Sequence, residues 1–265
     1  MMNPDNPLLV IRNLSTVYRS RGGNFRRGKD VVAVNNVSLS IVRGEIVGLA
    51  GGSGSGKSTL ARSVLRLIEP EAGEITFEGA DVCAMGRRQL RQFRRNAQIV
   101  FQDPGAALRP GWTVRRILAE PLLLHGIAPR HELDEHVNAL LETVELPAIV
   151  YDRYAFELSG GQRQRVAIAR ALSLRPSFLV ADEALSALDL SVQAAMLGLF
   201  HSLRERLDLS ILLIAHDIEV LGCIADRIAV MDQGDIVEIG AAGTLLSSPQ
   251  HPATRRLVAA TSWRN

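Results

Sequence analysis

The sequence of 265 residues is poor in cysteine and has no long apolar run. Its two cysteines, Cys83 and Cys223, lie far apart, with no C-x-x-C pair and no histidine at metal-ligand spacing. A disulfide framework or a zinc site is therefore not expected, and a reducing cytoplasm fits the cysteine content. The first residues are polar and lack the apolar stretch of a signal peptide. Because no window approaches about eighteen consecutive apolar residues, the chain is predicted not to cross a membrane, although it can lie against one.

An excess of one charge is also missing. The formal net charge of +2 is too small to argue for a nucleic-acid partner, and none is predicted. There are no internal repeats and no low-complexity tract. Apolar residues make up 47% of the chain, which is ample for a buried core. This length allows one large α/β domain or a core with an inserted subdomain.

One glycine-rich stretch has the form G-x-x-x-x-G-K-[ST]. It consists of Gly51, Gly52, Ser53, Gly54, Ser55, Gly56, Lys57, Ser58 and Thr59. An apolar run at 46–50 precedes it and a helical pattern at 60–68 follows, which is the strand–loop–helix context of a phosphate-binding loop. Such a loop aims backbone N–H groups inward, its lysine contacts the outer phosphates, and its serine can ligate Mg²⁺. A flexible Gly/Ser linker is the alternative, and the flanking strand and helix disfavour it.

Elsewhere the apolar periodicity predicts alternating strands and helices. Before residue 104, strands are expected at 8–14, 31–41, 73–79 and 97–101, a basic helix at 87–95 and an exposed loop at 19–30. After residue 159, helices are expected at 163–172, 192–207 and 218–225, and strands at 177–181, 210–215, 227–231 and 235–239. The tail from 241 reads as a short helix, a Pro-punctuated turn and a last helix. Buried strands alternating with helices indicate a mainly parallel sheet covered on both faces.

Residues 104–159 show no strand pattern. Apolar residues recur at helical spacing in 114–124 and 133–144, and Pro121 suggests a kink or break. We interpret this segment as a helical subdomain inserted into a nucleotide-binding core formed by 8–103 and 160–240.

Two further stretches have the composition of catalytic sites. A predicted strand ends in Asp182 and Glu183, where the first carboxylate could organise Mg²⁺ and the second could polarise an attacking water. Taken alone, two acids at a strand end are more often a cap or a turn. Ser159, Gly160, Gly161 and Gln162 lie at the start of a predicted helix, and a glycine-flanked helix N-terminus with a hydroxyl can bind an anion.

The phosphate-binding loop, the motif from Ser159 to Gln162 and the acidic pair, in this order along the chain, resemble the nucleotide-binding subunits of ABC transporters. The helix 163–172 continues that family's signature, and His216 lies 34 positions after Asp182, a spacing that also fits. The resemblance covers about residues 8–260. It implies a P-loop NTPase core with a mainly parallel sheet, an N-terminal antiparallel β-subdomain and an inserted helical subdomain. It also implies ATP hydrolysis with Mg²⁺.

The resemblance assigns roles to single residues. Tyr18 matches the aromatic that stacks on adenine, and Gln102 matches the glutamine that reaches Mg²⁺ beside Ser58 and Asp182. His216 matches the histidine that contacts the γ-phosphate, while Glu183 matches the catalytic acid. The motif from Ser159 to Gln162 would close over ATP held by a second subunit, and 186–189 would cross to that subunit.

The family also implies partners and a location. A second ATP-binding subunit is expected, with a heterodimer favoured and a homodimer possible, together with two permease subunits and, indirectly, an extracytoplasmic solute-binding protein. The chain would lie at the cytoplasmic face of the membrane. The segment 251–260 is similar to the tail of the dipeptide, oligopeptide and nickel importers, although Ala253 replaces a tyrosine. A soluble ABC ATPase of DNA repair or translation, without membrane partners, is the alternative. The absence of Asn-Lys-x-Asp disfavours a GTPase.

Two departures from the family pattern stand out. Ala184 and Leu185 follow the acidic pair where Pro-Thr is usual, which predicts altered loop stiffness with hydrolysis retained. Ala155 and Phe156 stand where relatives often have Pro-His, in a region that the family turns toward its membrane partner.

Overall fold

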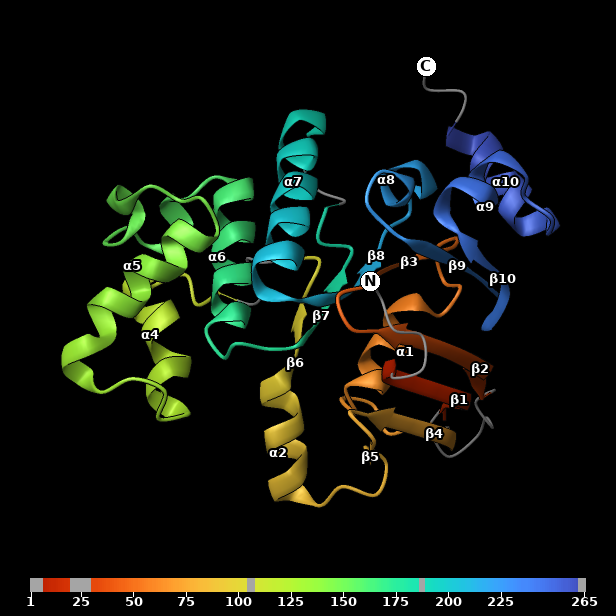
Figure 1. Ribbon diagram of the computed structural model, residues 1–265, viewed down its shortest axis with the longest axis horizontal. Coiled ribbons are helices and arrows are strands. Elements are labelled where there is room, and N and C mark those ends of the chain that lie inside the picture. Colours follow the sequence, from red (N-terminus) through yellow and green to blue (C-terminus); the bar gives the residue numbers. More distant parts are fainter. Residues whose placement is uncertain (1–6, 20–29, 104–107, 186–188, 262–265) are drawn as a thin grey trace, which may run out of the picture. The chain divides into compact units, whose positions relative to one another are not determined.

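The computed structural model describes residues 7–19, 30–103, 108–185 and 189–261. The chain divides into two compact units. Unit 1 comprises Met1–Arg94 and Ser210–Asn265, and unit 2 comprises Arg95–Leu209 (Figure 1). The predicted loop at 19–30 lies almost wholly outside the described residues.

Unit 1 contains an antiparallel sheet near the N-terminus. Its strand order is β2 (Val31–Val42), β1 (Pro7–Tyr18), β4 (Ala72–Phe77) and β5 (Ala80–Asp81). Strand β1 runs four residues beyond the predicted end at Leu14. The register shifts between Ile11 and Leu14, and Asn13 lies in the left-handed region at φ 50°. These irregularities break the apolar alternation while the ladder continues, so the pattern underestimates the strand.

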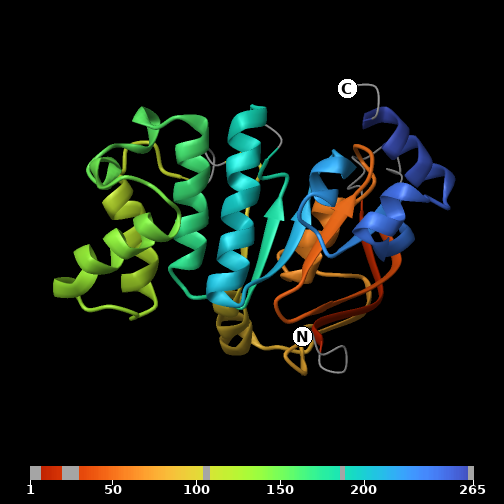
Figure 2. The same ribbon diagram turned by 45° about the horizontal axis from the view of Figure 1, so that its top comes forward.

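Unit 1 also contains parallel strands, in the order β10 (Asp235–Ala241), β9 (Arg227–Asp232), β3 (Ile46–Ala50) and β8 (Ser210–Ile214). Strand β3 pairs in parallel with β8 and β9, and β10 closes this side as an antiparallel strand. All residues of β3 and β8 are buried, as expected for strands covered on both faces. Helices α8 (Ile218–Gly222), α9 (Ala242–Ser247) and α10 (Pro252–Thr261) pack beside β3, β9 and β10 (Figures 1 and 2).

Helix α1 (Lys57–Val64) ends earlier than the predicted Ile68. Arg66 adopts φ 49°, and its N–H donates to the Ser63 carbonyl at 2.8 Å. The Arg66 guanidinium donates to the carbonyls of Val82 and Met85, while Arg94 of α2 (Arg87–Asn96) donates to the carbonyls of Leu65 and Arg66. The left-handed turn and these distant arginine contacts end the helix, although the apolar pattern continues past Val64.

Unit 2 combines two parallel strands with a helical part. Strand β6 (Ala97–Val100) pairs with β7 (Phe178–Asp182), with Val100 opposite Ala181. Helices α4 (Val114–Leu124), α5 (Leu133–Thr143) and α6 (Gly160–Leu172) pack against one another (Figure 2), and α7 (Leu190–Leu207) follows β7. Short 3₁₀ turns lie at Arg130–Glu132, Ala148–Val150 and Ala155–Glu157. The described part of 104–159 thus consists of helices, turns and one isolated bridge between Thr113 and Tyr154.

The expected break at Pro121 is wrong, because α4 continues through this residue. Proline removes one N–H donor and crowds the carbonyl four residues earlier. Pro121 lies in the last turn of the helix, and its own carbonyl still accepts the N–H of His125 at 3.1 Å. The disruption therefore falls where the helix ends anyway.

A buried carboxylate joins β2, β3 and β9 and gives a stability prediction. The Glu45 side chain accepts the Val42 N–H at 2.9 Å and Arg227 Nη1 at 3.0 Å, and Glu45 is only 2% exposed. Glu45→Ala should lower the free energy of unfolding by about 2–3 kcal/mol, because the Val42 N–H loses its acceptor and Arg227 Nη1 keeps only the Ser40 carbonyl at 3.3 Å. In urea unfolding, Glu74→Ala is the control, since its exposed pair with Arg12 at 4.0 Å should contribute about 0–1 kcal/mol. Equal losses in the two variants would contradict this role of Glu45.

Candidate functional site

The glycine-rich loop of unit 1 connects the buried strand β3 to helix α1. Gly56 precedes α1 at φ 106°, and Gly51 follows β3 at φ 156°. A methyl group at Gly51 would lie 2.3 Å from the Met231 carbonyl oxygen, and one at Gly56 would lie 2.1 Å from the Ala33 carbonyl oxygen. Both positions therefore require glycine, because neighbouring backbone from β2 and β9 closes in on the loop. The sequence motif did not reveal these distant supports.

The interior of the loop fits a phosphate group. Lys57 is 4% exposed, and its Nζ donates to the carbonyl oxygens of Gly51 and Gly52, both at 2.9 Å. The Ser55 hydroxyl is buried and has no hydrogen-bond partner among the described residues. Around a methyl group placed at Gly52 or Gly54, no atom of the described residues lies within 4 Å, apart from the glycine itself and its two chain neighbours. An orphaned hydroxyl, an inward lysine, open space and a helix N-terminus together suit a bound anion.

Tyr18 and His216 lie near this loop within unit 1. The Tyr18 hydroxyl is 3.2 Å from Thr59 Oγ1, and its side chain is 44% exposed at the end of β1. Leu49 of β3 stands opposite Ile214 of the parallel strand β8. Because parallel strands end at one edge of a sheet, the loop after β3 and the exposed His216 after β8 lie at that edge. Unit 1 thus brings together Tyr18, His216 and the phosphate loop.

A second group of predicted residues lies at the carboxyl edge of β6 and β7 in unit 2. Gln102 follows β6 and is exposed, whereas Asp182 ends β7 and is 3% exposed. Glu183 is 8% exposed and adopts φ 52°, a conformation that is uncommon for a residue other than glycine. Residues held this way cluster at functional sites. Ala184 and Leu185, the departure from the expected Pro-Thr, are both buried.

The Ser-Gly-Gly-Gln motif forms the N-terminus of α6. Ser159 Oγ accepts the Gln162 N–H at 3.3 Å, and Gln162 Oε1 accepts the Ser159 N–H at 3.0 Å. This reciprocal capping box leaves Ser159 and Gly160 exposed. A methyl group at Gly161 would lie 2.8 Å from Val192 Cγ1 of α7, so this glycine permits close packing. The exposed helix end has the polarity that favours an anion.

The predicted loop at 186–189 is described only at Asp189, since residues 186–188 lie outside the described residues. The Asp189 side chain accepts the Ser191 hydroxyl at 2.7 Å and the Val192 N–H at 2.9 Å. These hydrogen bonds hold the pKa of this carboxyl below its usual range and cap α7.

Within the described residues, no three His, Cys, Asp or Glu side chains gather as a metal site. The predicted Mg²⁺ ligands, Ser58, Gln102 and Asp182, include only one carboxylate. Oxygen donors of this kind still suit Mg²⁺, which keeps several waters and is commonly bound through one or two carboxylates plus substrate phosphates.

Similar proteins share nearly the whole chain. A family model described as ABC transporter matches residues 34–186. A Brucella ovis protein with the provisional name peptide import ATP-binding protein is 49% identical over 256 residues, which cover 97% of this chain and 79% of that protein. The glutathione import ATP-binding protein GsiA of Pectobacterium atrosepticum is 44% identical over 255 residues, covering 96% of this chain and 41% of GsiA.

Solved structures agree with the fold. The ATP-binding cassette MJ0796, a dimer bound to ADP and Pi, has a TM-score of 0.78 and 29% identity, covering 88% of this chain and 98% of that one. The cbiO1 protein from Clostridium perfringens, part of the ABC transporter complex cbiONQ, has a TM-score of 0.80 and 26% identity, covering 92% of each chain. They confirm the predicted fold class.

Among the described residues, no helix is both long and apolar enough to span a membrane.

Proposed function

Because this chain belongs to the ABC transporter family, we propose that it is the ATP-hydrolysing subunit of a membrane importer that takes up peptides. The family match confirms the resemblance found in the sequence, and the chain is an ABC-type ATPase. The observation that carries the importer proposal is the 49% identity to a peptide import ATP-binding protein over 97% of this chain. The names of the reported relatives support peptides as the solute, whereas nickel or a metal chelate remains a prediction without such support.

The phosphate-binding roles follow from the first group of residues. Lys57 would exchange its contacts with the loop carbonyls for the outer phosphates of ATP, whose charge it neutralises. Backbone N–H groups from Gly52 to Thr59 and the Ser55 hydroxyl would complete the cradle. Tyr18, exposed at the end of β1, offers a face for adenine to stack on. Ser58, Gln102 and Asp182 would hold Mg²⁺, which when bound neutralises charge on the transferred phosphate.

The hydrolytic roles fall to three side chains. Glu183 would accept a proton from the attacking water as general base. His216 would donate a hydrogen bond to the γ-phosphate, and Gln102 would help to orient the water. Phosphoryl transfer depends on such positioning and charge stabilisation, since little covalent chemistry is required of the protein.

A second subunit would complete each site. The exposed N-terminus from Ser159 to Gln162 would close over the γ-phosphate held by the neighbouring ATPase, so that two ATP molecules lie at a dimer interface. The dimeric cassette among the similar structures supports this arrangement. Loss of the γ-phosphate would release the interface and separate the subunits, which converts a local change of charge into a rigid-body movement. We favour a heterodimer, with a homodimer as the alternative.

The movement would be passed to two permease subunits, with this chain peripheral at the cytoplasmic face of the membrane and a solute-binding protein acting outside. Affinity purification of the native chain from solubilised membranes tests this proposal. Two multi-spanning permeases should co-purify in stoichiometric amounts. A chain recovered only with ribosomes or DNA would instead favour an ATPase of translation or repair, which no observation supports at present.

The half-site role of Ser159 gives a separate prediction. Ser159→Ala should lower steady-state ATPase activity of the assembled complex while leaving ATP affinity of the isolated chain unchanged, since the motif would contact a neighbour's ATP. Loss of the N-cap should also cost about 1 kcal/mol of stability. Thr113→Ala is the matched control, because Thr113 caps α4 through Arg116 N–H at 3.3 Å. If both variants lose the same activity, the Ser159 effect is only a loss of helix stability.

A further inference from the structure

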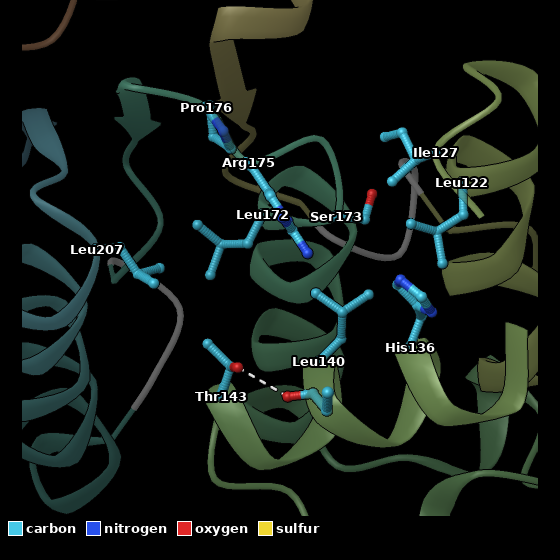
Figure 3. A pocket seen from close by; sticks show the side chains of 11 residues that line it. Leu122, Ile127, His136, Leu140, Thr143, Leu172, Ser173, Arg175, Pro176 and Leu207 are labelled. Carbon is cyan, nitrogen blue, oxygen red and sulfur yellow. Dashed lines mark hydrogen bonds between the residues drawn. The ribbon is translucent and has the colours of Figure 1, made fainter. Parts of the chain in front are cut away.

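Unit 2 contains a cavity of about 360 Å³ that none of the proposed nucleotide-binding residues lines (Figure 3). It lies among α4, α5, the end of α6 and the end of α7. Its walls are mostly apolar, and the lining residues include Leu122, Ile127, Leu140, Leu172, Pro176 and Leu207. This volume and apolar character are those of small-ligand sites, which span about 300–1,000 Å³.

Arg175 brings a positive charge to this apolar cavity. Its guanidinium makes no hydrogen bond or ion pair with any residue that the structure describes. Figure 3 shows the side chain extending into the cavity beside Leu172 and Ser173. Arg175 is exposed, and most of the side chains that line the cavity with it are apolar.

The backbone conformation at Arg175 is unusual for an arginine. Arg175 adopts φ 53° just after α6, and its N–H donates to the Leu172 carbonyl at 2.8 Å. This left-handed position after a helix is usually glycine or asparagine, because other residues are strained there. Pro176 follows and fixes the chain direction. Arg66, Glu145 and Asp208 adopt the same conformation after other helices, so the turn fixes where the Arg175 side chain starts, and the cavity beside it carries the inference.

The other polar groups lining the cavity have partners. Ser173 Oγ donates to the Arg170 carbonyl at 2.7 Å, and Thr143 Oγ1 donates to the Ala139 carbonyl at 2.7 Å. His136 Nδ1 lies 3.0 Å from the Glu132 carbonyl oxygen, which fits a donated hydrogen bond. Among the described residues that line the cavity, Arg175 is therefore the cation without a partner, in a mostly apolar interior. A complementary ligand has one anionic group that a guanidinium can bind in bidentate fashion and an apolar body.

We propose that this cavity binds a small amphipathic carboxylate, such as a medium-chain monocarboxylic acid. The carboxylate pairs with Arg175, and the hydrocarbon chain lies against Leu122, Leu140 and Leu172. This site goes beyond the proposed ATPase function and does not depend on it, because the ligand touches neither the phosphate loop nor the α6 N-terminus.

Calorimetric titration of the full chain, without nucleotide, tests this site with decanoate kept below its micelle concentration. We expect saturable binding at one site. Arg175→Gln keeps the backbone strain and removes the charge, and it should weaken binding at least 10-fold because a charge-assisted hydrogen bond is lost. Ala139→Phe should abolish binding by filling the cavity from an exposed position on α5. Arg130→Gln, an exposed arginine outside the cavity, should leave the affinity unchanged.

Decanol is the matched ligand, since it has the same chain without the carboxylate, and it should bind at least 10-fold more weakly. Equal affinity for decanol, unchanged decanoate binding in Arg175→Gln, or heats that never saturate would each overturn the proposal. Thermal unfolding of Arg175→Gln should match the unsubstituted chain, so that lost binding is not lost folding.

Discussion

A Glu183→Gln chain is expected to bind ATP with nearly unchanged affinity and to hydrolyse it at least about 100-fold more slowly. The amide preserves the size of the side chain at a position that is 8% exposed and strained at φ 52°, so the fold should be retained. What is lost is the carboxylate that accepts a proton from water. ATP binding would then close the dimer, and slow hydrolysis would leave it closed. The ATP-bound dimer should therefore accumulate.

Two measurements separate this outcome from a general defect. Phosphate release gives the turnover rate, and light scattering coupled to gel filtration gives the mass with and without MgATP. Glu135→Gln is the matched control, because Glu135 is an exposed carboxylate on α5 away from the proposed site. Near-normal turnover in Glu183→Gln would remove Glu183 from the role of general base.

The second large effect is expected for Lys57→Ala, which should bind ATP at least about 100-fold more weakly. A charged hydrogen bond contributes about 1.5–3 kcal/mol, and the ammonium group would make more than one to the triphosphate. Lys57→Arg should not restore affinity, because the planar guanidinium needs more room than the compact ammonium that fits between Gly51 and Gly52.

Equilibrium dialysis with labelled ATP measures this loss. Lys57 is buried and holds two loop carbonyls, so unfolding of each variant must be followed in parallel. A folded Lys57→Ala chain with undiminished ATP affinity would contradict the phosphate-binding role. A chain that binds AMP as tightly as ATP before any substitution would contradict it as well, since the loop is proposed to hold the outer phosphates.

The sequence was sufficient for features that depend on neighbouring residues. Ile46–Ala50 forms β3 because an uninterrupted apolar run suits a strand buried on both faces, and the predicted bounds match the observed ones. The glycine pattern from Gly51 to Gly56 has few other uses between a buried strand and a helix. Ser159 and Gln162 form the capping box that their spacing allows.

Features that depend on distant contacts could not be predicted. Helix α1 ends at Val64 because Arg66 turns left-handed and Arg94, far along the chain, donates to the carbonyls of Leu65 and Arg66 just after the helix. The closeness of Met231 and Ala33 to the phosphate loop is likewise set by how β9 and β2 fold back. Arg175 is, in the sequence, an ordinary residue before a proline, and only the apolar cavity beside it singles it out.

The central claim is that this chain holds a triphosphate with its own phosphate loop and completes a neighbour's site with the N-terminus of α6. A crystal structure of the Glu183→Gln chain with MgATP, together with any ATPase partner that co-purifies, tests it most directly. We predict Lys57 at the γ-phosphate within one subunit and Ser159 at the triphosphate held by the other. A triphosphate bound by a single subunit, with Ser159 facing solvent in the closed assembly, would contradict the claim.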